Sequence, residues 1–297
     1  MTDGAGYGAV IPCQGVSALV DRYDGFIVDQ WGVLHDGVRP YPGALVCLER
    51  LRAAGKRVVI LSNSGRREAD NIQLMARLGF PRNLFDRLIC AGEDAREAIA
   101  GRSSEFHGRL GRRCYAFTQD GDLAVLEGLP VDIVDRVAEA DFLIVLRMDS
   151  ERRGLAAYEA ELQAGIARGL PMVCANPDLS RVSMQGLLEG PGVLAQRYEE
   201  LGGAVFYHGK PHPAIYRSCL KALGDPPAGR VLAVGDSVEH DVLGASRIGL
   251  RSALVTGGIH IEALGGAWGE LPGAEAWRRH SATAVAQPDY LLPAFVW

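Results

Sequence analysis

Five polar side chains whose types suit one reaction follow short apolar runs in this sequence: Asp29, Ser62, Lys210, Asp236 and Asp241. Carboxylates repel one another unless a cation joins them, and their hard oxygen ligands suit Mg²⁺. A hydroxyl, strand-end amides and a lysine suit the oxygens of a phosphate group. This combination predicts a phosphoryl-transfer site in which Asp29 is the candidate nucleophile.

The segments that carry these residues alternate between two patterns. Buried strands are predicted at GFIVDQ (25–30), RVVILSNS (57–64), VLAVGDS (231–237) and RSALVTGG (251–258), and helices at 41–54, 66–78 and 238–248. Strand-helix-strand alternation predicts an α/β fold with a parallel sheet and right-handed crossovers. Such sheets bind ligands at the carboxyl ends of their strands, so the five side chains are expected to converge.

The middle of the chain has an alternation of its own, with strands at 113–118, 141–147 and 171–178 and a helix at 155–168. It interrupts the sheet pattern described above. We therefore expect a core domain made of residues 1–86 and 204–297, with a second α/β domain, residues 87–203, inserted into it.

Composition excludes several classes of function. The 297 residues carry a net charge of -5 with a pI of about 5.8, which does not favour nucleic acid or an anionic membrane as partner. No secretory signal is recognisable, and the longest apolar run, 142–146, is too short to span a bilayer.

Six cysteines without CxxC spacing indicate reduced, buried thiols and a cytoplasmic protein. Three C-terminal tryptophans, Trp268, Trp277 and Trp297, are expected to pack in the core and at the edge of a short last strand, 289–292.

Four motifs resemble those of the haloacid dehalogenase (HAD) superfamily: DQWGVL at 29–34, Ser62, GKPHPAIY around Lys210, and GDSVEHD at 235–241. ILSNSGR, CANPD and GKPxP together resemble its class IIA branch. The resemblance implies a Rossmann-like core with helices on both faces of a parallel sheet, and Mg²⁺ as cofactor. It also implies that Asp29 is the nucleophile and that Ser62 and Lys210 bind phosphate. Asp29, Asp236 and the backbone carbonyl of Trp31 would hold the metal, with Asp241 in its outer shell.

In this branch the inserted domain is a cap that selects the substrate, and this implies further site residues. Asn63 and Ser64 at the end of the second strand, and Asn176 and Asp178 in the cap loop, are expected to bind substrate. Arg147 is a further candidate, with an exposed salt bridge as the alternative. Branch members act on sugar phosphates, nucleotides, glycerol phosphate or pyridoxal phosphate, which implies a small phosphorylated metabolite as partner. Caps of related proteins also carry dimer contacts, so the resemblance leaves a homodimer as an open alternative.

Trp31 departs from the family pattern. Family phosphatases have a carboxylate there, which protonates the leaving group and then activates water. General acid–base help of this kind contributes roughly 10²–10⁴-fold. An indole has no usable proton equilibrium, although its backbone carbonyl can still bind metal. His35, Asp36, His208 and Asp178 are the candidates to replace the acid.

Four interpretations follow from Trp31. The protein is an enzyme that does without the acid, a dehalogenase, a phosphonate-cleaving enzyme, or a silent protein that binds a phosphorylated ligand. Dehalogenases of this family carry an aromatic residue at this position but work without Mg²⁺, so the retained Asp236 and Asp241 count against that alternative. Phosphonate cleavage needs a cap lysine, and the chain has only Lys56, Lys210 and Lys221. We favour the enzyme with altered leaving-group chemistry.

Overall fold

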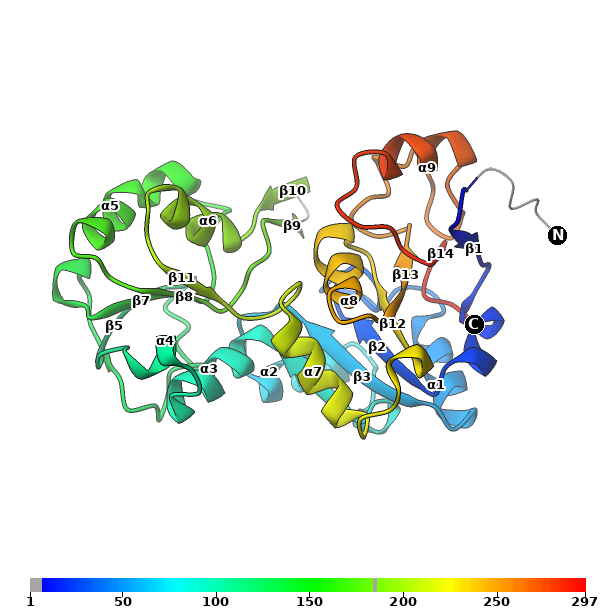
Figure 1. Ribbon diagram of the computed structural model, residues 1–297, viewed down its shortest axis with the longest axis horizontal. Helices are drawn as coiled ribbons and strands as arrows, with labels where there is room; N and C mark the ends of the chain where they lie inside the picture. Colours follow the sequence, from blue (N-terminus) through cyan, green and yellow to red (C-terminus); the bar gives the residue numbers. More distant parts are fainter. Residues whose placement is uncertain (1–6, 184–185) are drawn as a thin grey trace. The chain divides into compact units, whose positions relative to one another are not determined.

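The computed structural model describes residues 7–183 and 186–297, and the chain divides into two units (Figure 1). Unit 1 comprises Met1–Ser62, Ile72–Ile89 and Lys210–Trp297. Unit 2 comprises Asn63–Asn71 and Cys90–Gly209. The described residues of each unit are built around their own sheet, and the fold is α/β.

Unit 1 holds a sheet of seven strands in the described part of the chain, in the order β1-β14-β13-β12-β2-β3-β4. The neighbours from β1 to β3 pair in parallel. The strands are β1 (Ile11–Pro12), β2 (Gly25–Asp29), β3 (Arg57–Ser62), β4 (Arg87–Cys90), β12 (Val231–Gly235), β13 (Arg251–Val255) and β14 (Tyr290–Leu292). The helices in or entering this unit are α1 (Ala44–Ala53), α2 (Glu68–Arg77), α7 (Pro213–Ala222), α8 (Leu243–Ser246) and α9 (Ala274–Ser281).

The central strands are buried on both sides, which is why their sequences are apolar without alternation. All five residues of β2 and all five of β12 are buried. Ile27 of β2 packs with Ile215 and Cys219 of α7 and with Ala245 of α8. Helices cover both faces of the sheet, as the sequence predicted.

The register of the sheet brings the carboxyl ends of three strands together. Asp29 pairs with Leu61, one residue before Ser62. On the other side Val28 pairs with Val234, two residues before Asp236. The sheet therefore places Asp29, Ser62 and Asp236 at one edge.

Unit 2 holds a sheet of five parallel strands among the described residues, in the order β11-β8-β7-β5-β6. They are β5 (Arg113–Phe117), β6 (Asp132–Ile133), β7 (Phe142–Val145), β8 (Met172–Cys174) and β11 (Val205–Tyr207). An antiparallel hairpin pairs β9 (Ser180–Ser183) with β10 (Gly186–Glu189). The helices are α3 (Ala91–Gly101), α4 (Glu105–Gly108), α5 (Glu159–Ala167) and α6 (Gly192–Glu200).

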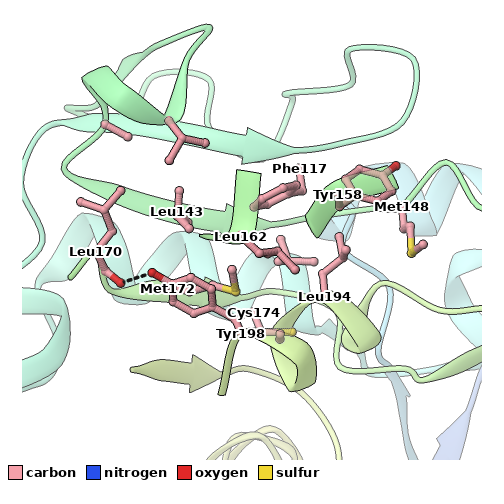
Figure 2. Close-up of a cluster of buried hydrophobic side chains, with 14 residues drawn as sticks. Phe117, Leu143, Met148, Tyr158, Leu162, Leu170, Met172, Cys174, Leu194 and Tyr198 are labelled. Atoms are coloured by element: carbon pink, nitrogen blue, oxygen red, sulfur yellow. Dashed lines mark hydrogen bonds between the residues drawn. The ribbon is translucent and has the colours of Figure 1, made fainter. Parts of the chain in front are cut away.

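One hydrophobic cluster of unit 2 lies between its sheet and helices α5 and α6 (Figure 2), and a second packs the sheet against α3. Leu143 and Met172 of the sheet pack with Leu162 of α5 and Leu194 of α6. Tyr198 of α6 is fully buried, and its hydroxyl donates a hydrogen bond of 2.7 Å to the carbonyl of Leu170. An apolar core of this kind indicates that unit 2 has its own source of stability.

One local prediction needs correction. The helix expected over 238–248 begins as one turn of π-helix, Val238–Val242, and continues as α8. Of the tryptophans expected in the core and at the edge, Trp277 is buried beside Leu291 of β14, whereas Trp268 is 37% exposed. All six cysteines are buried and free, as predicted. Within the described residues, no helix is long and apolar enough to cross a membrane.

Candidate functional site

Three carboxylates meet at the carboxyl edge of the unit 1 sheet. Asp29 ends β2, Asp236 directly follows β12, and Asp241 lies in the π-helical turn behind it. One oxygen from each lies within 4.8 Å of the others, and all three side chains are buried. Ser237 caps the turn, because its Oγ accepts a hydrogen bond from the amide of His240 (3.2 Å).

Two glycines allow this close approach. A Cβ on Gly235 would lie 1.9 Å from Cγ of Asp241. A Cβ on Gly32 would lie 1.9 Å from Oδ2 of Asp236, and Gly32 also has a φ of +78°. Any larger residue at these positions would push the carboxylates apart, so the glycines are part of how the sequence builds the site.

Lys210 joins two of the carboxylates. Its Nζ lies 2.6 Å from Oδ1 of Asp29 and 2.9 Å from Oδ1 of Asp241, and its side chain is 3% exposed. Backbone amides contribute as well: Gln30 donates to Asp29 (2.7 Å), and Ile259 donates to Asp236 (2.8 Å). The ammonium fixes the orientation of the candidate nucleophile.

The electrostatics of this cluster fit a divalent cation. Burial raises the pKa of Asp29 well above its usual range against the opposing effect of Lys210, and Asp241 and Asp236 raise it further. Burial and Asp241 raise the pKa of Asp236 to about 7. One ammonium cannot balance three buried carboxylates, whereas a hard dication bound by their oxygens would. The donor set therefore suits Mg²⁺.

Trp31 folds back onto its own loop. A Cβ on Gly37 would lie 2.3 Å from Cζ3 and Cη2 of the indole, so the ring covers the backbone of Gly37. The ring also meets His35 edge-on, with 5.0 Å between the ring centroids. The indole remains 40% exposed. The indole therefore packs against other residues of its own loop, at the position where family phosphatases have a carboxylate.

Neither neighbour in that loop is suited to replace the acid. His35 is fully buried, which lowers its pKa to about 4, and its Nδ1 accepts a hydrogen bond from the amide of Gly37 (2.9 Å). Burial acts to raise the pKa of Asp36, but hydrogen bonds from the amides of Arg39 and Val38 lower it on balance. At neutral pH both side chains are therefore deprotonated and cannot donate a proton to a leaving group.

The predicted substrate-binding residues beyond Ser62 lie in unit 2. Nδ2 of Asn63 donates to Oδ1 of Asp178 (2.8 Å), and Oδ1 of Asn176 accepts from the amide of Asp178 (3.2 Å). Ser64 accepts from the amide of Arg66 (3.3 Å). The structure thus brings Asn63, Asn176 and Asp178 together within one unit, although their roles toward substrate stay predictions.

Arg147 is bonded within unit 2 to neighbours of its own. Its guanidinium lies 3.1 Å from Oδ2 of Asp122 and 3.0 Å from Oε1 of Gln119. This is the salt bridge considered as the alternative, although the arginine is half-buried rather than exposed. A substrate-binding role for Arg147 stays a prediction.

His208 belongs to a buried chain of hydrogen bonds in unit 2 that the sequence did not reveal. Its Nδ1 lies 2.5 Å from Oδ2 of Asp94, and its Nε2 lies 3.1 Å from Nε2 of His107. Nδ1 of His107 in turn lies 2.7 Å from Oγ of Ser104. Both ring nitrogens of His208 are therefore occupied by unit 2 side chains. The pairing depends on tertiary contact across 101 and 114 residues, which no local pattern signals.

Two aromatic residues near Asp236 were also missed as site candidates. Tyr41 precedes α1, and burial together with the charge of Asp236 raises its pKa. Trp268 stacks on Tyr41, with ring centroids 6.4 Å apart and ring planes at 15°. The only sequence signal for them is that they lie in segments following predicted strands.

Comparisons with known proteins agree with this site. The family model described as haloacid dehalogenase-like hydrolase matches residues 26–131, and a HAD-hydrolase-like model matches residues 207–276. Chronophin of Bos taurus is 30% identical over 267 residues, covering 81% of this chain and 83% of chronophin.

Two further relatives cover most of the chain. D-glycerol 3-phosphate phosphatase of Mycobacterium tuberculosis is 25% identical over 283 residues, covering 93% of this chain and 71% of that protein. The crystal structure of a haloacid dehalogenase-like hydrolase from Brucella suis 1330 is 32% identical, covers 95% of this chain and 99% of its own, and superimposes with a TM-score of 0.80. The buried Asp29–Lys210–Asp236–Asp241 cluster, the fold and these matches agree, and this chain belongs to the haloacid dehalogenase-like hydrolase family.

Proposed function

We propose that this protein is a Mg²⁺-dependent phosphatase that hydrolyses phosphate monoesters of small metabolites through an aspartyl-phosphate on Asp29. The observation that carries the proposal is the buried cluster of Asp29, Asp236 and Asp241 held by Lys210. The relative named for D-glycerol 3-phosphate supports a small phosphorylated substrate. Unit 2 is proposed to be the inserted cap domain of the class IIA branch.

In this mechanism an oxygen of Asp29 attacks phosphorus, and the bond from phosphorus to the leaving oxygen breaks with its electron pair on that oxygen. Lys210, 2.6 Å from Asp29, opposes the rise in the pKa of that carboxyl and is expected to donate to a phosphate oxygen. The hydroxyl of Ser62, at the end of the neighbouring strand, is a further donor to those oxygens. When bound by Asp29, Asp236 and the Trp31 carbonyl, with Asp241 behind, Mg²⁺ would neutralise the charge that develops on the phosphoryl group.

The same mechanism gives a restricted choice of leaving group. With Trp31 in the acid's position, and with His35 and Asp36 deprotonated at neutral pH, no side chain of this loop protonates the leaving oxygen. Esters of acidic alcohols, such as aryl phosphates, should therefore react faster than alkyl phosphates. Hydrolysis of the aspartyl-phosphate should be slow, because Trp31 takes the position of the carboxylate that activates water in family phosphatases.

The test is intact-mass spectrometry of the protein after mixing with an aryl phosphate, with and without Mg²⁺. We expect a phosphoryl adduct on the wild type in the presence of Mg²⁺ and none on Asp29→Asn. Asp36→Asn is the matched control, since it removes an exposed carboxylate from the same loop. A wild type that binds the ester but never forms an adduct or product would instead identify a silent phosphate-binding protein.

A further inference from the structure

Three aromatic side chains follow the strands on either side of Asp236. Trp31 and Tyr41 lie between β2 and α1, and Trp268 lies between β13 and α9. In the sheet, β2 and β13 are the two neighbours of β12, which leads directly into Asp236. Loops that follow parallel strands gather at one edge of a sheet, so all three residues belong to the same edge as the carboxylates.

Contacts of the backbone show how close these loops come to Asp236. Gly32, next to Trp31, lies against the carboxylate of Asp236, since a Cβ on Gly32 would be 1.9 Å from Oδ2 of Asp236. On the other side a Cβ on Gly258 would be 2.3 Å from the same oxygen. A Cβ on Gly257 would be 3.3 Å from Cδ1 of Trp268. The loops of Trp31 and Trp268 therefore flank Asp236.

Two of these aromatic groups are open to solvent. Trp31 is 40% exposed and Trp268 is 37% exposed, while Trp277 of the same C-terminal region is buried. Trp268 and Tyr41 stack nearly parallel, which gives this edge a flat aromatic face. Flat aromatic faces favour stacking with other planar rings and add specificity to the burial of apolar area. A proposed phosphate-binding site beside the aromatic face of Trp268 and Tyr41 suits a ligand with one phosphate and one planar apolar group.

We propose that Trp268 and Tyr41, together with Trp31, form a subsite for a planar aromatic leaving group of a phosphate monoester. The inference rests on the proposed function and adds a substrate class to it. A phenol-like alcohol has a pKa of about 10, against 15.7 for water, so its anion leaves phosphorus without a protonating side chain. Asp29 gains the phosphoryl group, the aryl oxygen leaves with the electron pair and takes its proton from solvent, and water then releases phosphate from Asp29.

Binding of phosphonates that cannot be hydrolysed tests the subsite apart from turnover. In the presence of Mg²⁺, calorimetry would compare benzylphosphonate with cyclohexylmethylphosphonate, which matches it in size but is not planar. Methylphosphonate reports on the phosphate-binding part alone. Stacking interactions of this kind predict that the wild type binds benzylphosphonate about 3- to 10-fold more tightly than the cyclohexyl analogue.

Two variants at one position assign that preference. Trp268→Leu keeps an apolar side chain without a ring, and the affinity ratio should fall to about one. Trp268→Phe keeps a ring and should retain most of the ratio. Circular dichroism and thermal unfolding would show that both variants are folded.

The possible failures are distinguishable. A ratio near one in the wild type, or a ratio that Trp268→Leu leaves unchanged, overturns the aromatic subsite while the phosphatase stands. If methylphosphonate and benzylphosphonate both fail to bind, the phosphate site itself is wrong, and the subsite fails with it.

Discussion

Replacing Trp31 with Asp would test whether the missing acid limits this site. General acid–base catalysis by such a group contributes roughly 10²–10⁴-fold, or about 3–5 kcal/mol of barrier. We expect kcat/KM for an alkyl phosphate to rise by that factor relative to Trp31→Asn, which has nearly the same shape but no proton to give. Comparison with Asn rather than with the wild type separates the acid from the loss of the indole.

The structure predicts a cost in stability for both variants. Deleting a fully buried aromatic side chain costs about 3–5 kcal/mol. Trp31 is 40% exposed, so about three-fifths of that, roughly 2–3 kcal/mol, should be lost when its contacts with Gly37 and His35 disappear. Asp should cost more than Asn without Mg²⁺, because it adds a fourth carboxylate to a crowded cluster. Urea unfolding of the three proteins, with and without Mg²⁺, would measure both effects.

The assay is a series of phosphate esters whose alcohols differ in acidity. For the wild type and Trp31→Asn, log kcat/KM should fall steeply as the pKa of the alcohol rises, whereas Trp31→Asp should show a shallow dependence. Rapid mixing with an aryl ester should give a burst of alcohol release before slow turnover in the wild type. Equal kcat/KM of folded Asp and Asn variants toward alkyl esters would refute the reasoning, and so would a flat dependence in the wild type.

Three further predictions use the same structure. Lys210→Met should lower kcat/KM by more than 10²-fold, because Asp29 loses its charged partner at 2.6 Å; unchanged steady-state rates would contradict this. Asp236→Asn should abolish the stabilisation that Mg²⁺ gives the wild type, about 2.7 kcal/mol at 100 times the dissociation constant. Equal Mg²⁺-dependent shifts of the melting temperature in the two proteins would exclude Asp236 as a ligand. Burial and His208 lower the pKa of His107 to about 4. Between pH 6.5 and 4 the unfolded chain therefore binds the proton more readily than the folded protein does. The free energy of unfolding is expected to fall as the pH falls through this range, by up to about 3 kcal/mol. His107→Gln should remove that part of the pH dependence in urea unfolding, and a variant with the wild-type profile would assign it to other groups.

The fold was predictable because its strands are buried on both faces, and this leaves a continuous apolar run such as GFIV or VLAV in the sequence. Asp29, Asp236 and Lys210 were predictable as site candidates because polar residues that end such runs gather at one edge of a parallel sheet.

Tertiary contacts were not predictable in the same way. The bond between His208 and Asp94 joins residues 114 positions apart, and nothing in either segment indicates the partner. The stack of Trp268 on Tyr41 was not predicted, because the loop of Trp268 has no periodicity and its partner is more than 200 positions away in the sequence. The sequence thus predicts what backbone periodicity determines, while side-chain partners require the three-dimensional packing.

The packing around Trp31 also bears on whether this site is altered or lost. Gly37, with a φ of +91°, lies directly under the indole, and its amide donates to His35, which meets the same ring edge-on. The three residues fit one another, which is the packing expected of a loop that accommodates a tryptophan. Meanwhile Asp236 stays buried with a pKa raised to about 7 by burial and by Asp241, so its charged form destabilises the fold when no cation is bound. A pocket without function could replace buried charges by apolar side chains at no loss. A loop fitted to its tryptophan beside a buried carboxylate cluster supports the proposal of an enzyme with altered leaving-group chemistry.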